Sequence, residues 1–334
     1  MNKNTGSTTI APAISRTADT AALCKWSMAR HGYLHSVAHV LPSDTIPLLA
    51  SLAEASAGPS GYSSFRASPL LHWCYATRAS AVLRAVQTFL EDKEGDANRR
   101  LDKGGRLRER LVVVLGGGMD GLVLALCARA AEATGVGVKV VELDAPEVVA
   151  RKEGVLGAWR EGGREGAVRE FLRQTGSYRL EAVDLREGGR VGEVVGEVVR
   201  EGGGAGREGE APPDGDGSKG GGQGEVEPQV LFILEAVLGY MRLQEVKILL
   251  STLPMVAPSS SLLIIDTGRT SALKNDDAVA AAVDAAFEAR GCSLTGLAGW
   301  KDRLEGRREG GRGGGRREGG REGGREQEGR RSDE

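Results

Sequence analysis

Long apolar runs are missing from this sequence of 334 residues. No apolar stretch uninterrupted by glycine or charge reaches the ~18 residues that a membrane-spanning helix needs. An excess of charge is missing too, because the formal net charge is −2 and the isoelectric point is about 6.2. Overall charge therefore gives the protein no attraction for nucleic acid or for an anionic membrane surface, and we expect neither as a partner.

Cysteine pairs are also missing. The cysteines are scattered along the chain, with no C-x-x-C spacing and no histidines at matching distances: Cys24, Cys74, Cys127 and Cys292. This pattern fits neither a disulfide framework nor a zinc site, so we expect reduced thiols and no bound metal. The sequence thus indicates a cytoplasmic protein, which we expect to be monomeric.

Composition divides the chain into a domain and two tails. Residues 1–20 are rich in serine and threonine. They fit a disordered tail better than an organellar transit peptide, because no amphipathic basic face is evident. The tail at 301–334 is of low complexity, since residues 302–334 hold ten arginines, nine acids and eleven glycines, with almost nothing to bury. RNA binding by this tail is an alternative, but no aromatic residues alternate with its arginines. We expect one domain at residues 21–300.

Alternating strand and helix signals fill most of that domain. Apolar runs predict strands at residues 111–115, 138–143, 178–183, 230–234 and 261–265. Helical stretches between them imply crossover connections, so the predicted fold class is α/β, a doubly wound and mostly parallel sheet.

Helices are predicted in front of this sheet. A predicted helix at 78–91 has one apolar face, formed by Ala81, Val82, Ala85, Val86, Phe89 and Leu90. Two glycine-rich stretches, 160–170 and about 200–228, interrupt the pattern of the domain, and the second predicts a surface insertion.

The segment LVVVLGGGMDGLVLAL, residues 111–126, places glycines at a strand-to-helix turn. Gly116, Gly118 and Gly121 fit G-x-G-x-x-G, which lets the backbone approach a ligand, although a plain tight turn is the alternative. An ionised Asp120 in this turn would repel the pyrophosphate of a dinucleotide. The sulfonium and amino groups of S-adenosylmethionine are cationic, so the turn favours that ligand.

Carboxylates follow the predicted strands at the edge where parallel sheets bind ligands. Glu142 and Asp144 end the second strand, where an acid would hold a ribose diol, and Asp184 and Leu185 follow the third, where adenine would lie. Glu235 ends the fourth strand after four apolar residues, so we expect it to be partly buried. Each acid has a structural alternative as a helix cap or a solvated loop residue.

These motifs resemble those of a known family. LGGGMDG, ELDAPEVVARK, VDLRE and LEAVLGYM are similar, in order and approximate spacing, to the motifs of the leucine carboxyl methyltransferases. The segments ALCKWSMARHGYLH and YATRASAVLRAVQTFLE resemble that family's opening helices, so the resemblance covers about residues 20–265 without the glycine-rich insertions. It implies a Rossmann-like, class I S-adenosylmethionine-dependent enzyme. Such an enzyme methyl-esterifies the C-terminal leucine carboxylate of the protein phosphatase 2A catalytic subunit.

The resemblance also implies roles for individual residues. It would place Lys25 and Arg78 near the methionine or substrate carboxylate, Gly116 and Gly118 against the cofactor, Asp144 at the ribose, Asp184 and Leu185 at the adenine, and Glu235 at the amino group. Tyr240 would line the acceptor pocket or pack beside it, and Arg78 is also suited to a surface ion pair. A carboxylate acceptor is already ionised at neutral pH, so no general base is required. The four histidines, His31, His35, His39 and His72, are expected at the surface or at helix caps.

The chain departs from the family after residue 265. The family continues its last parallel strand into a Tyr-Glu-Gln segment where this chain has LLIIDTGRT, and an Arg-Gly-Glu tail replaces the final antiparallel strand pair. Alternatives therefore stay open. One is a catalytically inactive module that binds S-adenosylmethionine. Another is the paralogous tRNA wybutosine-synthesizing methyltransferase, although its usual propeller domain and a basic stripe for tRNA are missing. Small-molecule methyltransferases of the same superfamily are a third, and a nicotinamide dehydrogenase fits least.

Overall fold

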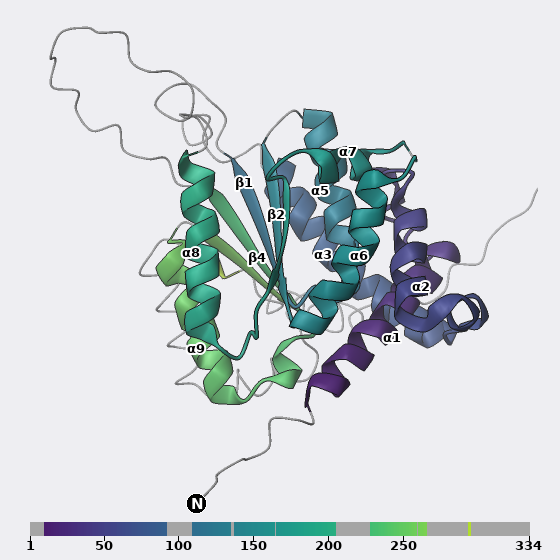
Figure 1. Ribbon diagram of the computed structural model, residues 1–334, viewed down its shortest axis with the longest axis horizontal. Helices are drawn as coiled ribbons and strands as arrows, with labels where there is room; N and C mark the ends of the chain where they lie inside the picture. Colours follow the sequence, from purple (N-terminus) through teal and green to yellow (C-terminus); the bar gives the residue numbers. More distant parts are fainter. Residues whose placement is uncertain are drawn as a thin grey trace, which may run out of the picture. The chain divides into compact units, whose positions relative to one another are not determined.

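The computed structural model describes residues 10–91, 109–134, 137–163, 165–204, 228–258, 260–265 and 293–294 (Figure 1). Its helices are α1 (Ile10–Arg30), α2 (Thr45–Ser64), α3 (Pro69–Glu91), α5 (Leu122–Thr134), α6 (Pro146–Glu161), α7 (Ala167–Arg173), α8 (Gly188–Gly204) and α9 (Leu243–Val256), with the short 3-10 helices η1 (Ala38–Val40) and η2 (Leu238–Tyr240). Its strands are β1 (Arg110–Leu115), β2 (Val138–Asp144), β3 (Tyr178–Ala182), β4 (Gln229–Glu235), β5 (Ser260–Ile265) and β6 (Ser293–Leu294). The predicted Arg/Gly/Glu tail and most of the glycine-rich insertion lie outside the described residues.

The strands form one parallel sheet in the order β3-β2-β1-β4-β5-β6. Val113 of β1 aligns with Val141 of β2 and with Phe232 of β4. After β3 the chain crosses β1 to form β4, so the strand order reverses between β1 and β4, and this is the point where such sheets bind ligands. The predicted α/β, doubly wound fold class is confirmed. The five predicted strands are present with ends that differ by at most one residue, and only the short β6 was not predicted.

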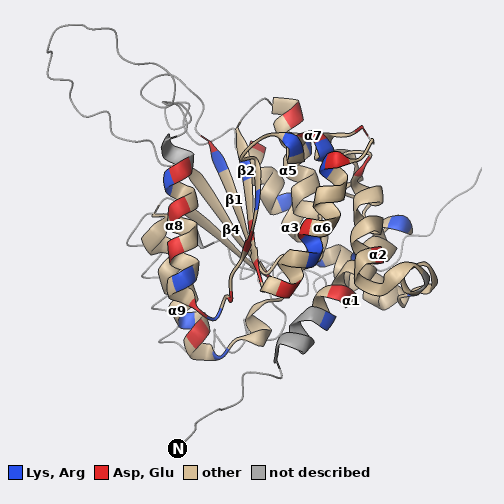
Figure 2. Cartoon of the chain, in the orientation of Figure 1, with Lys and Arg blue, Asp and Glu red and all other residues tan. Residues whose placement is uncertain are grey.

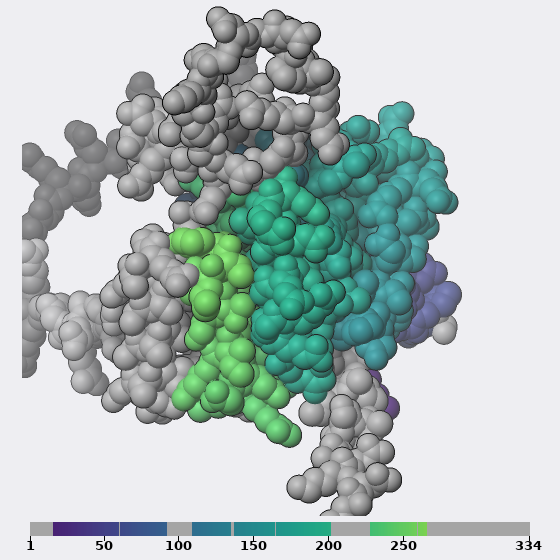
Figure 3. Space-filling view, turned by 60° about the vertical axis from the view of Figure 1, so that its left-hand side comes forward, coloured from purple at the N-terminus to yellow at the C-terminus, as the bar shows by residue number. Residues whose placement is uncertain are grey.

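Each face of the sheet is covered by helices. Val112 and Val114 of β1 pack into one core with residues of α1, α2, α3, α5, α6 and α7. Leu111, Val113 and Leu115 point to the opposite core, which α8 and α9 complete. Figure 1 shows α8 and α9 on one side of the sheet, and Figure 3 shows them side by side on the surface. Because both faces of β1 are buried, its sequence is an unbroken apolar run.

Helix α8 shows how the amphipathic pattern orients a helix on the sheet. Its inner side carries the buried valines Val191, Val194, Val195, Val198 and Val199. Acidic and basic residues are interspersed along α8 (Figure 2), among them the exposed ion pair of Arg190 and Glu193 at 2.9 Å. Among the described residues, no helix is long and apolar enough to cross a membrane.

The N-terminal tail is shorter than predicted, because α1 begins at Ile10. The assignment of residues 10–20 to a disordered tail was therefore wrong. Arg151 of α6 donates a hydrogen bond of 2.7 Å to Asp19, and this contact anchors α1 near its middle. The partner lies 132 residues away in the sequence, so local composition could not reveal it. α1 then packs on α2 and α3, and α3 packs on β4 and β5.

Two local predictions also need correction. The buried stripe of α3 is rotated from the predicted one: Ala81, Ala85 and Phe89 are only partly buried, whereas Ala79 and Leu83 are buried. The stretch 160–170 interrupts the domain less than predicted, since α6 ends at Glu161 and α7 begins at Ala167. A carboxylate distant in the sequence stabilises the beginning of α7: Asp44 accepts a hydrogen bond of 3.1 Å from the Val168 N–H in the first turn of that helix.

Candidate functional site

A cavity of about 410 Å³ lies at the carboxyl ends of β1, β2 and β4, where the strand order reverses. α1 and α3 supply the wall beside β4, and the loop after β3 supplies another wall. The residues to which the family resemblance assigns roles all line this cavity: Lys25, Arg78, Gly116, Gly118, Asp144, Asp184, Leu185, Glu235 and Tyr240. Their predicted convergence is therefore seen in the structure, while their roles toward a ligand stay predictions.

The glycine turn between β1 and α5 forms the floor of the cavity. Gly116 has φ 75° and Gly118 has φ 59°, backbone conformations that residues with a side chain rarely adopt. A Cβ atom on Gly116 would lie 2.5 Å from Cγ2 of Val237, so this position is also closed by packing. Gly121 serves a different purpose, because a Cβ there would meet Leu48 of α2 at 2.7 Å. The glycines thus shape the turn and admit close packing behind it.

Four charged side chains gather at one end of the cavity. The Lys25 ammonium lies 2.5 Å from Oδ2 of Asp120 and 2.9 Å from Oε2 of Glu235, and Arg78 Nη2 lies 2.8 Å from Oε1 of Glu235. Burial lowers the pKa of Lys25, but the two carboxylates outweigh it and hold that pKa above its ordinary value. Burial likewise raises the pKa of Asp120, and Lys25 outweighs it and holds that pKa below its ordinary value. Two basic and two acidic side chains thus contact one another, and their formal charges cancel in sum.

The ion pair of Lys25 and Asp120 corrects the prediction that was based on the charge of Asp120 alone. The sequence suggested that its free charge would repel a pyrophosphate, yet Lys25 neutralises it. The backbone N–H groups discriminate between ligands better than the charge of Asp120 does, since a phosphate binds the free N–H groups at a helix start. Gly118 N already donates to Oδ2 of Asp144 at 2.6 Å, and Leu122 N donates to Oδ1 of Asp120 at 2.9 Å. The carboxylates thus occupy donors that a dinucleotide would use.

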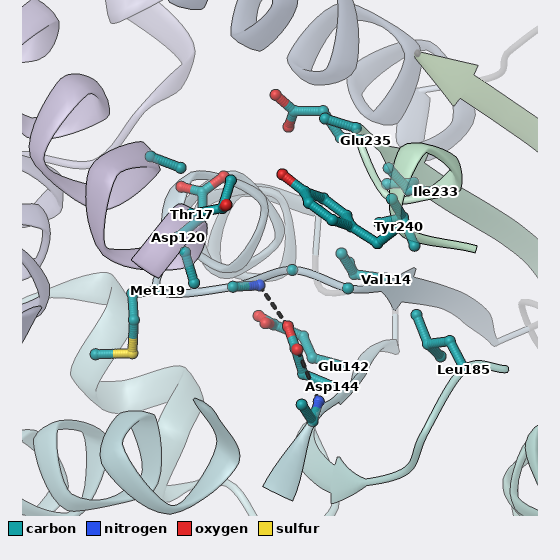
Figure 4. A pocket seen from close by; sticks show the side chains of 18 of the residues that line it. Thr17, Val114, Met119, Asp120, Glu142, Asp144, Leu185, Ile233, Glu235 and Tyr240 are labelled. Carbon is teal, nitrogen blue, oxygen red and sulfur yellow. Dashed lines mark hydrogen bonds between the residues drawn. The ribbon is translucent and has the colours of Figure 1, made fainter. Parts of the chain in front are cut away.

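Asp144 ends β2 inside the cavity (Figure 4). Besides the Gly118 bond, its Oδ1 accepts a hydrogen bond of 2.7 Å from Ala145 N. Burial raises the pKa of Asp144 above its ordinary value although both backbone bonds oppose that shift. A carboxylate has about four lone-pair sites, so Asp144 retains capacity for two hydroxyl donors.

Asp184 has a partner that the sequence analysis did not consider. Arg186 Nε lies 2.8 Å from Oδ1 of Asp184 and Nη2 lies 2.5 Å from Oδ2. The hydrogen bonds from Arg186 hold the pKa of Asp184 below its ordinary value. Leu185 between them is buried and lines the cavity. Any amino group that binds Asp184 therefore shares this carboxylate with a guanidinium.

Two tyrosines wall the cavity. Tyr240 of η2 is 38% exposed and reaches into the cavity with its hydroxyl end (Figure 4). Tyr75 of α3 was missed by the sequence analysis, although it lies one helical turn before Arg78, whose guanidinium carbon is 5.0 Å from the Tyr75 ring centroid. Beside β4, Ala236 has φ 56°, an uncommon conformation for a residue with a side chain. Such conformations concentrate at functional sites.

None of the histidines and none of the described cysteines lines the cavity. His31, His35 and His39 are exposed as predicted, but His72 is buried, and the surface prediction for it was wrong. His72 Nε2 lies 2.9 Å from Ser27 Oγ, a contact across two helices that sequence could not reveal. Burial raises the pKa of Cys24 to about 11, so its thiol stays protonated at neutral pH.

Cys24, Cys74 and Cys127 are free thiols, and Cys292 lies outside the described residues. Within the described ranges, no group of three or more His, Cys, Asp or Glu residues could hold a metal ion.

Comparison with known proteins adds no identification, because no protein-family model and no curated protein matches this chain. The fold and the cavity define a class: a Rossmann-like α/β protein with a ligand-sized cavity at its switch point. The walls of that cavity combine a charge-paired end, two strand-end carboxylates and an apolar middle.

Proposed function

We propose that this chain is an S-adenosylmethionine-dependent methyltransferase of the leucine carboxyl methyltransferase family. The observation that carries the proposal is the cluster of Lys25, Arg78, Asp120 and Glu235. Two cations and two anions at one end of a cavity match the α-carboxylate and α-ammonium of an amino acid group. When this zwitterion binds, its carboxylate pairs with a cation of the cluster and its ammonium pairs with an anion. The charges in the cavity still cancel, and this is important because an unpaired buried charge is costly.

The rest of the cavity fits the nucleoside part of the same molecule. Asp144 presents a carboxylate at the end of β2, where a ribose diol donates two hydrogen bonds. Leu185 offers an apolar surface for a purine, and Asp184 lies at the edge of that surface. The cavity volume of about 410 Å³ falls in the range for small-molecule sites. The occupied donors of Gly118 and Leu122 favour a ligand without phosphate over a dinucleotide.

Methyl transfer to a carboxylate requires little acid–base chemistry from the protein. When bound, S-adenosylmethionine supplies an electrophilic methyl group. The acceptor carboxylate is ionised at neutral pH, so the residues of the chain need to bind, align and exclude water. Lys25, Arg78 and Glu235 fix the amino acid end, while Tyr75 and Tyr240 shield the apolar middle from water.

The acceptor in this proposal is the C-terminal leucine carboxylate of the protein phosphatase 2A catalytic subunit. The family resemblance suggests that acceptor, and one feature of the site supports a carboxylate. The buried Nε of Arg78 has no hydrogen-bond partner among the described residues, while Nη2 holds Glu235. A guanidinium with a spare donor suits a second carboxylate. The proposal places the enzyme in the cytoplasm, where thiols such as that of Cys74 stay reduced.

Peptide methylation tests the acceptor. Purified protein and labelled S-adenosylmethionine are incubated with a peptide ending in the phosphatase sequence, and with the same peptide amidated at its C-terminus. We expect label in the free-acid peptide only, as a base-labile methyl ester. Transfer to a tRNA-borne carboxylate instead would favour the wybutosine pathway. S-adenosylmethionine binding with no transfer to either acceptor would favour the inactive binding module.

A further inference from the structure

Lys152 of α6 is buried beneath the glycine turn, with 0% of its surface exposed. Its ammonium donates to the Gly118 carbonyl oxygen at 3.0 Å, to the Asp120 carbonyl oxygen at 2.5 Å, and to Glu142 Oε2. An ammonium has three hydrogens, so each of them has one acceptor. Two of the three acceptors belong to the backbone of the turn itself.

These contacts determine how the turn faces the cavity. Both peptide groups of Gly118 are held, because its carbonyl accepts from Lys152 and its N–H donates to Asp144. The Asp120 carbonyl is held by Lys152 while the Asp120 side chain meets Lys25. A peptide flip in this turn would break a hydrogen bond to a buried charge, and such bonds are about twice as strong as neutral ones. Lys152 therefore stabilises one backbone conformation of a glycine-rich segment that could otherwise adopt many conformations.

We propose that Lys152 is a positioning residue for ligand binding: it fixes the 118–120 backbone so that the carboxylates of Asp144 and Asp120 face the ligand. The inference rests on the proposed function and deepens it. Lys152 does not line the cavity, so it acts through the turn. Its role toward the ligand lies in the two carbonyl contacts, whereas the Glu142 pair compensates the buried charge.

Those two roles are separable by mutation. Lys152→Met removes both, and it leaves Glu142 buried without a cation. The double variant Lys152→Met/Glu142→Leu also removes that stranded charge, so it recovers stability but not the donors to the turn. Glu142→Gln keeps Lys152 and its two bonds to the turn. Lys139→Met is the matched control, since Lys139 pairs with Glu109 at 2.9 Å near the opposite end of β2.

The measurement is calorimetric titration of each folded variant with S-adenosylmethionine, beside chemical unfolding. We expect the double variant to be more stable than Lys152→Met and yet to bind about tenfold or more weakly than the native chain. Glu142 also lines the cavity, but Glu142→Gln keeps a side-chain acceptor there and keeps the Lys152 bonds to the turn, so it should lose less than about threefold in affinity. Lys139→Met should bind as the native chain does.

Three results overturn the inference while the proposed function stands: a double variant with native affinity, Glu142→Gln with a loss as large as the double variant, or Lys139→Met with a comparable loss. Because Glu142→Gln preserves the shape of the side chain and keeps Lys152, a loss of about tenfold or more in that variant overturns the inference even where the Lys152 variants do not fold. A native chain that binds no S-adenosylmethionine contradicts the proposed function itself.

Discussion

Replacement of Lys25 by methionine is the most informative perturbation of the charge cluster. Lys25 is buried and is the only described cation paired with Asp120, while Glu235 keeps Arg78. Removal of one partner from a buried ion pair costs about 3–5 kcal/mol, because an uncompensated charge remains. We expect the free energy of unfolding of Lys25→Met to fall by about that amount near pH 7.

The loss in the free energy of unfolding of Lys25→Met depends on pH, and the structure determines the direction of this dependence. In the native protein Lys25 holds the pKa of Asp120 below its unfolded value, so this stability is present above the unfolded pKa and is lost as the pH falls through the folded one. Without Lys25, burial raises the folded pKa of Asp120, and the penalty then grows as the pH rises above the unfolded value of about 3.9. The deficit should therefore be larger near pH 7 than near pH 4.

Urea unfolding followed by circular dichroism measures both quantities. Lys139→Met is the control, since its pair with Glu109 is partly exposed and should contribute about 0–1 kcal/mol. The double variant Lys25→Met/Asp120→Asn should recover part of the loss. A deficit below about 1 kcal/mol near pH 7, or one of equal size near pH 4, would refute the reasoning.

Three further outcomes are expected. Gly116→Ala forces a side chain into a left-handed conformation against Val237, so calorimetry should find S-adenosylmethionine binding abolished, and thermal unfolding should find a loss of about 1–3 kcal/mol. Arg186→Ala frees the Asp184 carboxylate, so adenosine-containing ligands should bind at least as tightly as to the native chain; weaker binding would assign Arg186 itself to the ligand. Asp44→Ala removes the carboxylate that caps α7 and should cost about 1 kcal/mol in urea unfolding with ligand binding unchanged; lost binding would contradict a purely structural role.

Strand positions could be predicted because burial on both faces leaves a strong local signal. The runs that became β1 and β4 are continuous and apolar, and each is followed by a residue type that marks the edge of the sheet. The convergence of Asp144 and Glu235 then follows from parallel pairing alone, since adjacent strands end at the same edge.

The partners inside the site could not be predicted in the same way. Lys25 is separated by 95 residues from Asp120 and by 210 from Glu235, and nothing local to any of them specifies the pairing. From the sequence alone, Asp120 is therefore expected to carry a free charge that repels a dinucleotide, whereas in the folded chain Lys25 pairs with it.

Two missed residues had local signals. Arg186 is two residues after Asp184, so their ion pair was within reach of a turn. Lys152 lies on the apolar stripe of α6 with Val148, Leu156 and Trp159, at helical spacing. A lysine inside such a stripe must find a buried acceptor, which is reason to search the adjacent strand end for one.

The central claim is that the cavity binds S-adenosylmethionine through the strand-end carboxylate and the charge cluster. Its most direct test is calorimetric titration of the purified chain with S-adenosylmethionine, beside Asp144→Ala and with NAD as the competing ligand. The account predicts that the native chain binds S-adenosylmethionine, that Asp144→Ala binds it about tenfold or more weakly, and that NAD does not bind. Binding of NAD, or no binding of S-adenosylmethionine by a folded native chain, would contradict the account.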